Sequence, residues 1–203
     1  DSGGSIRIPA SNCGLFGLKP SRGLVPLGHD RAEGLAGFSV AHAVTHSVRD
    51  SAMLLDVTHG PIPGAIYSAP DTQGGFLQSL EGDLPQFKVG LCTGGFAGET
   101  IDTRCEKAAI DAGRLCESVG CVVEEVISPV DGAALREAFD VLFSANIASV
   151  VGSVLSRRLG QNPKTLFEPL TIACAEAGQR RTAVEYVGAI ERIQQAADVL
   201  GRF

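Results

Sequence analysis

The chain begins with the stretch Asp1-Ser2-Gly3-Gly4-Ser5-Ile6-Arg7-Ile8-Pro9, which decides how the rest of the sequence is interpreted. It places Ser5 directly after two glycines, and glycine adopts backbone angles that other residues avoid. A serine in such a turn can expose its hydroxyl while neighbouring backbone N–H groups converge on one point. An acyl-transfer nucleophile needs both features, an accessible oxygen and donors for developing negative charge. The stretch therefore predicts a nucleophilic serine in a glycine-rich loop.

This pattern continues to Ser21 as Asp-Ser-Gly-Gly-Ser-Ile-Arg-Ile-Pro-Ala-Ser-Asn-Cys-Gly-Leu-Phe-Gly-Leu-Lys-Pro-Ser. It resembles the core of the amidase signature family: Asp-x-Gly-Gly-Ser-Ile-Arg, then Pro, Cys-Gly and Gly-Leu-Lys-Pro-Thr or Ser. Residues 47–61 are similar to the helix and turn that follow in that family, and residues 87–203 look like its later region. One departure lies at residues 43–46, which read Ala-Val-Thr-His where many members have Gly-Pro and then an arginine.

The resemblance implies an α/β fold, a mixed β-sheet covered by helices. Residues 1–203 are then part of a single amidase domain that begins here at the nucleophile loop. Members of the family use a Ser-Ser-Lys triad, and their lysine base and bridging serine precede the position of Asp1. The chain starts in a loop and stops inside a helical pattern, so we expect it to be the rear portion of a longer polypeptide.

Carried over position by position, Ser5 matches the family's nucleophile. The family's oxyanion hole matches the backbone N–H groups of Ser2, Gly3, Gly4 and Ser5. No lysine of the chain, Lys19 included, stands in a context that matches the family's base.

Asp1 and Arg7 match charged residues that shape the nucleophile loop in the family. The Arg7 guanidinium could bind a substrate carboxylate or pair with Asp1. We favour the pairing, because both residues belong to the motif and opposite charges stabilise a tight loop.

The expected function is amide-bond hydrolysis through an acyl-enzyme, with a small-molecule amide as substrate and no cofactor. Two alternatives remain: a non-catalytic truncated relative, and an A-type subunit of glutaminyl-tRNA amidotransferase. The sequence identifies no particular amide, and a homo-oligomer remains open.

Composition excludes other classes of function. A net charge of −6 argues against nucleic acid as a partner, because phosphate binding requires a basic face. No uninterrupted run of 18 apolar residues is present, so we expect no membrane span. The six cysteines show no Cys-x-x-Cys pair, which favours buried reduced thiols and a cytoplasmic protein.

Three weaker patterns receive structural interpretations. His42 and His46 have the spacing of two metal ligands on a helix, but no carboxylate completes a site and we expect hydrogen-bonded or solvated histidines without metal. Cys13 lies near Ser5 without a base, so we expect it to pack as a small apolar residue. The glycine loop fits neither a P-loop nor a dinucleotide fingerprint.

Periodicity places the remaining elements. Residues 1–40 are expected to form turns and short strands, and a helix should start after Ser47 with Val48, Ala52 and Leu55 on its apolar side. Strands at 87–92 and 121–127 flank a helix at 102–119, a βαβ-like unit closed by Gly120. Further helices are expected at 132–159, 165–177 and 182–203. In the helix at 102–119, the residues expected on the apolar side are Cys105, Ala108, Ala109, Ala112, Leu115 and Cys116. In the helix at 132–159, the expected core residues are Leu135, Phe139, Leu142, Phe143, Val150 and Val154.

Overall fold

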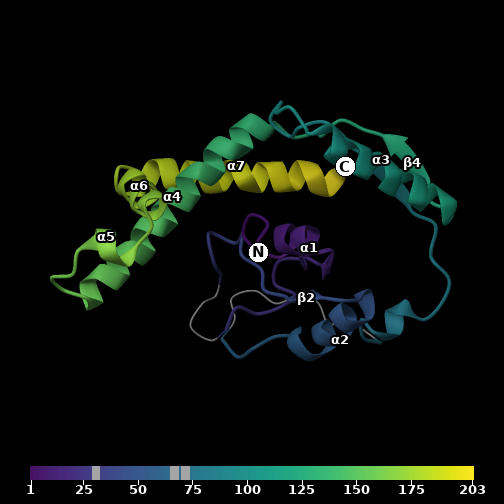
Figure 1. Ribbon diagram of the computed structural model, residues 1–203, viewed down its shortest axis with the longest axis horizontal. Helices are drawn as coiled ribbons and strands as arrows, with labels where there is room; N and C mark the ends of the chain where they lie inside the picture. Colours follow the sequence, from purple (N-terminus) through teal and green to yellow (C-terminus); the bar gives the residue numbers. More distant parts are fainter. Residues whose placement is uncertain (29–32, 65–68, 70–73) are drawn as a thin grey trace. The chain divides into compact units, whose positions relative to one another are not determined.

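The computed structural model describes residues 1–28, 33–64, 69 and 74–203. Two compact units divide the chain, Asp1–Asp83 and Leu84–Phe203, and Figure 1 shows their elements. Both contain helices and a two-stranded sheet; the strands are antiparallel in the first unit and parallel in the second. The α/β class is therefore confirmed, with the two strand orientations found in separate small sheets.

The first unit packs two helices against its sheet. Its elements are α1 (Arg7–Cys13), β1 (Phe16–Gly17), β2 (Val44–Thr45), α2 (Val48–Thr58) and the 3-10 turn η1 (Gln78–Leu80). In the sheet, Phe16 pairs with Thr45 and Gly17 pairs with Val44.

Helix α1 corrects the expectation that residues 1–40 contain only turns and short strands. Its N-cap is Ile6, which offers no side-chain acceptor, so the sequence carries no polar start signal. Packing holds the helix instead: Ile6 and Ala10 are buried, and a Cβ on Gly17 of β1 would lie 2.6 Å from the Ala10 Cβ. The helix ends at Gly14, whose φ of 64° is left-handed.

Helix α2 begins as the sequence predicts. The Ser47 hydroxyl accepts a hydrogen bond from the Asp50 N–H at 3.1 Å, which satisfies a backbone donor of the first turn. Ala52 and Leu55 are buried as expected, whereas Val48 is 48% exposed and does not join them.

The second unit begins with the predicted βαβ arrangement. β3 (Lys88–Leu91) and β4 (Val122–Glu125) are parallel and are joined by α3 (Thr103–Ser118). Asp102 caps α3 by accepting from the Arg104 N–H, and Gly120 follows the helix with a φ of 94°. All three boundaries agree with the sequence prediction to within a few residues.

The face that α3 turns to the sheet differs from the predicted one. Gly113 is its buried residue, and a Cβ there would lie 3.2 Å from a Leu91 methyl group. Ala109, Ile110 and Cys116 are half-buried. The other predicted contacts, Cys105, Ala108, Ala112 and Leu115, are exposed. Apolar periodicity misses this face because its central residue has no side chain.

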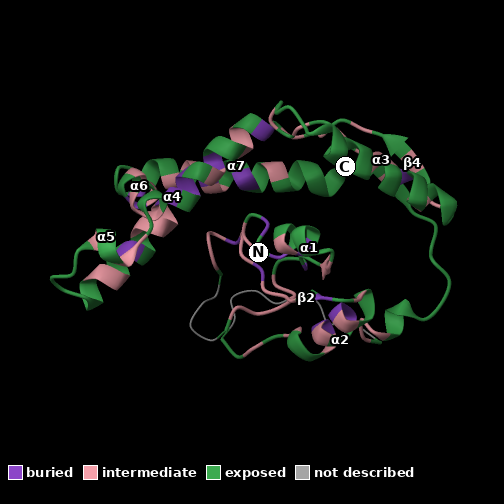
Figure 2. Cartoon of the chain, viewed as in Figure 1, coloured by how far each residue is buried: buried purple, intermediate pink, exposed green. Residues whose placement is uncertain are grey.

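Helices α4 (Gly132–Arg157), α5 (Pro163–Leu166), α6 (Pro169–Gln179) and α7 (Ala183–Arg202) complete the second unit. α4 packs against both α6 and α7, and Figure 2 shows its buried residues in purple along these contacts. Gly178 of α6 allows the closest approach, since a Cβ there would lie only 1.9 Å from the Ser144 carbonyl oxygen.

The buried residues of α4 combine small and branched side chains. Ala138, Val141, Leu142, Ser144 and Val151 are buried, and of the predicted contacts only Leu142 is among them. Leu135, Phe139 and Val154 are half-buried, while Phe143 and Val150 are exposed. Leu142 is fully buried, whereas at Gly178 the backbone of α6 itself approaches the Ser144 carbonyl of α4.

By length and composition alone, α4 would also suit a membrane span, although the chain has no uninterrupted run of 18 apolar residues. A helix at the centre of a folded unit passes the same test, and α4 packs against two other helices in the structure.

Candidate active site

The Asp1 carboxylate fixes the loop that carries Ser5. Its two oxygens accept from the N–H groups of Gly4 (2.8 Å), Ile6 (3.2 Å) and Arg7 (3.4 Å). The Arg7 guanidinium adds two more bonds, each of 3.1 Å, so the expected ion pair forms. The Asp1 side chain is fully buried. One buried acidic group therefore organises the backbone on both sides of Ser5.

Gly4 gives the loop its sharp turn. Its φ of 127° is one that side chains rarely allow, and a Cβ would lie 2.5 Å from the Ile8 Cδ1. The Gly4 carbonyl accepts from the Ile8 N–H at 2.7 Å, which joins the turn to α1. Ser5 follows directly and is exposed. A side chain at position 4 would therefore strain the turn directly before Ser5.

The backbone donors of the loop divide into two groups. Gly4 was predicted among the oxyanion donors, but its N–H already donates to the Asp1 carboxylate. The N–H groups of Ser2, Gly3 and Ser5 donate to no acceptor within the described ranges 1–28, 33–64, 69 and 74–203. Within those ranges, three backbone donors near Ser5 therefore have no protein acceptor.

Lys19 is the lysine of this motif, and its ammonium group hydrogen-bonds to a backbone carbonyl and not to Ser5. Its Nζ donates to the Pro20 carbonyl at 2.8 Å. Burial, followed by the positive charges of Arg7 and Arg22, lowers the pKa of Lys19. In the part of the chain that the structure describes, no side chain hydrogen-bonds to the Ser5 hydroxyl. The structure thus gives no reason to assign Lys19 as the base.

His42 and His46 lie in different environments. The His42 Nε2 is 2.7 Å from the hydroxyl of Ser51, a buried residue of α2, and burial lowers the His42 pKa. His46 is exposed. Among the described residues, no group of three or more His, Cys, Asp or Glu side chains is arranged to hold a metal ion.

All six cysteines are free thiols, but the expectation that they are buried is wrong. Cys13, Cys92 and Cys105 are exposed, and Cys116, Cys121 and Cys174 are half-buried. Cys13 ends α1 and is exposed, so the prediction that it packs as a small apolar residue is wrong.

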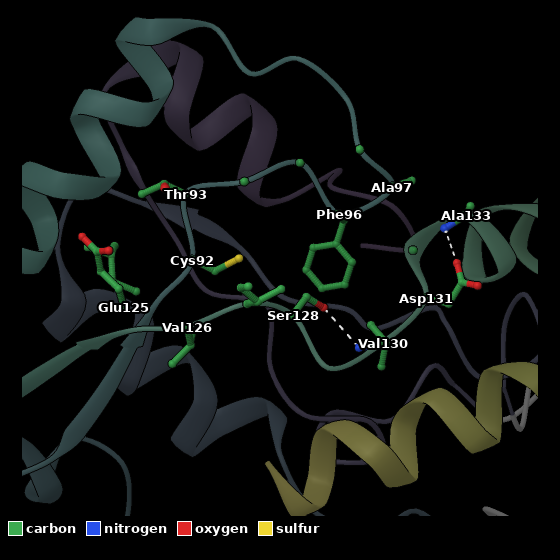
Figure 3. Close-up of a pocket in the computed structure, with 16 residues that line it drawn as sticks. Cys92, Thr93, Phe96, Ala97, Glu125, Val126, Ser128, Val130, Asp131 and Ala133 are labelled. Atoms are coloured by element: carbon green, nitrogen blue, oxygen red, sulfur yellow. Dashed lines mark hydrogen bonds between the residues drawn. The ribbon is translucent and has the colours of Figure 1, made fainter.

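The second unit contains a cleft of about 770 Å³ that the sequence interpretation missed. It lies where β3 and β4 end and α4 begins, and Figure 3 shows Phe96 and Ser128 between Cys92 and Val130. The carboxyl ends of parallel strands are a common place for ligands. The run Gly94-Gly95 directly after a predicted strand was the available signal.

The cleft is built by a glycine-rich turn held against α4. Glu99 accepts from the Ala97 N–H at 2.8 Å and forms an ion pair with Arg136 of α4. A Cβ on Gly132 would lie 1.8 Å from the Phe96 carbonyl oxygen, so the turn and the helix are in backbone contact.

Comparison with known proteins gives a consistent result. A family model described as Amidase matches residues 1–199. The 6-aminohexanoate-cyclic-dimer hydrolase of Paenarthrobacter ureafaciens is 31% identical over 175 residues, which are 84% of this chain and 34% of that protein. The A-type subunit of the glutamyl-tRNA(Gln) amidotransferase of Thermus thermophilus is 34% identical over 166 residues, 78% of this chain and 33% of that protein.

A solved structure of a 6-aminohexanoate cyclic dimer hydrolase complexed with substrate has the same fold. It superposes with a TM-score of 0.84 at 27% identity, covering 100% of this chain and 43% of that one. The chain therefore spans about a third to two fifths of the length of these relatives.

Proposed function

The chain belongs to the amidase family, and on this basis we propose that it carries the nucleophile of an enzyme that hydrolyses amide bonds through an acyl-enzyme. One observation carries the proposal. Ser5 is exposed on a loop fixed by a buried carboxylate, and three backbone N–H groups beside it are unoccupied within the described residues. These are the two requirements of a serine nucleophile, an accessible oxygen and a prepared site for negative charge.

In the proposed reaction the Ser5 hydroxyl gives up its proton while its oxygen attacks the amide carbonyl carbon. The carbonyl oxygen becomes negatively charged, and the N–H groups of Ser2, Gly3 and Ser5 donate to it. Collapse of the tetrahedral intermediate breaks the carbon–nitrogen bond, and the amine leaves with a proton. Water then attacks the Ser5 ester and releases the carboxylic acid. The Asp1 carboxylate contributes by keeping the loop in position.

The base is proposed to lie outside these residues. The family pattern places a lysine and a bridging serine ahead of the Asp1 position. The lysine acts as a base only if its surroundings lower its pKa. We propose that this segment and both units of the chain form one amidase domain, which needs no cofactor. The free thiols are consistent with a cytoplasmic enzyme.

The first candidate substrate class is a small-molecule amide. The cyclic-dimer hydrolase matches more of this chain than the amidotransferase protein does, 84% against 78%, and a structure of such a hydrolase superposes closely. An amidotransferase A-type subunit is the second candidate, because that relative has the higher identity, 34% against 31%. Hydrolysis of a cyclic amide without partner subunits favours the first candidate. Activity on glutamine only, and only with partner subunits, favours the second.

The test compares three forms of the natural polypeptide that carries this chain, on a panel of cyclic and linear amides. In Ser5→Ala, kcat/KM should fall by at least about 1,000-fold, since loss of a triad member removes nucleophilic catalysis. Ser11→Ala is the matched control, because Ser11 is an exposed serine of α1 in the same motif, and its activity should equal wild type. Undiminished hydrolysis by Ser5→Ala would refute the proposal.

A further inference from the structure

A single side-chain bond ties the nucleophile loop to a distant part of the first unit. The hydroxyl oxygens of Ser2 and Ser39 lie 2.6 Å apart, which is a hydrogen bond between residues 37 positions apart. The backbone beside them is also paired. The Val40 N–H donates to the Asp1 carbonyl at 3.1 Å, and the Asp1 nitrogen donates to the Val40 carbonyl. Residues 39–40 therefore flank the loop at its Asp1–Ser2 end.

Ser39 is held in place by an unusual turn. Leu35 and Ala36 both have a φ of 50°, a left-handed conformation that residues with a side chain adopt at an energetic cost. The Ser39 N–H donates to the Gly34 carbonyl at 3.0 Å. A Cβ on Gly34 would lie 2.7 Å from the Ser39 hydroxyl oxygen, so only glycine leaves room for that hydroxyl. Two strained residues and one glycine thus fix the position of a single hydroxyl group.

The partner of that hydroxyl connects it to the proposed chemistry. Ser2 immediately precedes Gly3, whose N–H is one of the three donors that have no acceptor among the described residues. The Asp1 carboxylate fixes the loop at Gly4, Ile6 and Arg7, but it makes no bond to the peptide group between Ser2 and Gly3. In the described part of the chain, the Ser39 hydroxyl is the side-chain partner of the Ser2 hydroxyl.

We propose that Ser39 is a positioning residue: its hydrogen bond to the Ser2 hydroxyl holds the Ser2–Gly3 backbone, and thereby the oxyanion donors, in the orientation needed for catalysis. This inference rests on the proposed amidase function of Ser5. It assigns a role to a residue outside the glycine-rich motif. Donors must be in place before charge develops, because their benefit depends on avoiding reorganisation during the reaction.

The test measures amide hydrolysis and thermal unfolding of Ser39→Ala and Ser39→Thr in the natural polypeptide. Loss of one oxyanion donor lowers kcat by about 100- to 1,000-fold, and a loosened donor should cost less, so we expect about a tenfold lower kcat in Ser39→Ala. KM should stay within about twofold, because the bond acts on the transition state. Ser39→Thr retains a hydroxyl and should recover most of the loss. Ser11→Ala again serves as the control.

A double-variant cycle tests the same bond from its other end. Ser2→Ala should lower kcat as much as Ser39→Ala, and the double variant should be no worse than either single variant. If Ser39→Ala fails to fold, Ser2→Ala alone tests the bond, and a wild-type kcat in folded Ser2→Ala would overturn the inference. Wild-type kcat in folded Ser39→Ala, with or without a lower melting temperature, would overturn the inference. Fully multiplicative losses in the double variant would also overturn it.

Failure of this inference differs from failure of the proposed function. If Ser5→Ala is inactive and Ser39→Ala retains the wild-type kcat, only the role of Ser39 is wrong. If Ser5→Ala retains activity, the proposed function is wrong and the role of Ser39 falls with it.

Discussion

The contact between α4 and α6 should not tolerate a single added methyl group. In Gly178→Ala, the new Cβ would lie 1.9 Å from the Ser144 carbonyl oxygen and 2.4 Å from its carbon. Both are backbone atoms, so no side-chain rotation relieves the clash. Cβ contacts below 3.0 Å essentially never occur in proteins, so the two helices must separate by about 1 Å.

Two opposing effects set the magnitude. Alanine is favoured over glycine inside a helix by up to about 1 kcal/mol. Against this, overpacking costs about 1–3 kcal/mol or more, and a gap of about 1 Å forfeits a quarter to a half of the dispersion energy across the contact. Leu142 of α4 and Ala175 of α6 are both buried, and the two helices pack against each other. The steric effect should win, leaving a net destabilisation of about 2 kcal/mol.

Urea unfolding followed by far-UV circular dichroism measures the difference. Gly152→Ala is the matched control: Gly152 also lies within a helix of this unit, is exposed, and has no atom within 4 Å of an added Cβ. The control should be stabilised by about 0.5–1 kcal/mol through helix propensity alone. If Gly178→Ala is stabilised to the same extent as Gly152→Ala, the close packing of α4 against α6 is refuted.

Three further predictions follow from other contacts. Asp1→Asn should lower the free energy of unfolding by about 2–4 kcal/mol, because the amide nitrogen replaces an acceptor oxygen with a donor and Arg7 loses its ion pair. Urea unfolding measures this loss, and a change below about 0.5 kcal/mol would contradict the prediction. Burial lowers the His42 pKa below its ordinary 6.5, so the unfolded chain binds the proton first as pH falls. The stability that the His42–Ser51 bond contributes should therefore be complete above about pH 6.5 and decline below it. Urea unfolding midpoints of wild type and His42→Gln, measured across this pH range, test it. If the difference between the two midpoints does not change with pH, the prediction is wrong. Gly132→Ala should lower the free energy of opening of the glycine-rich turn by about 1–3 kcal/mol, since the added Cβ meets the Phe96 carbonyl. Amide hydrogen exchange of that turn should then become faster. Unchanged exchange would argue against the contact between the turn and α4.

Local signals in the sequence predicted the elements that depend on them. Ser47 and Asp102 cap their helices as polar N-caps should, and Gly120 closes α3 in a left-handed conformation. The alternation of strand, helix and strand predicted the parallel pair of β3 and β4. These features are encoded within a few residues, so one sequence is enough to find them.

Other features depend on contacts that periodicity does not report. Helix α1 has no polar cap and is held by packing beneath Gly17. Gly178 brings α6 against the backbone of α4 at Ser144, and of the six apolar residues expected in the core of α4 only Leu142 is buried. The bond between Ser2 and Ser39 joins residues 37 positions apart, and its local sign, a pair of left-handed non-glycine residues, is visible only in the backbone.

The central claim is that Ser5 is the nucleophile, and covalent labelling tests it most directly. A fluorophosphonate reacts with an activated serine when the hydroxyl oxygen attacks phosphorus and fluoride leaves. The natural polypeptide should be labelled stoichiometrically, with the added mass on Ser5 in the tryptic peptide ending at Arg7, and Ser5→Ala should remain unlabelled. Labelling of another residue, or equal labelling of Ser5→Ala, would contradict the account.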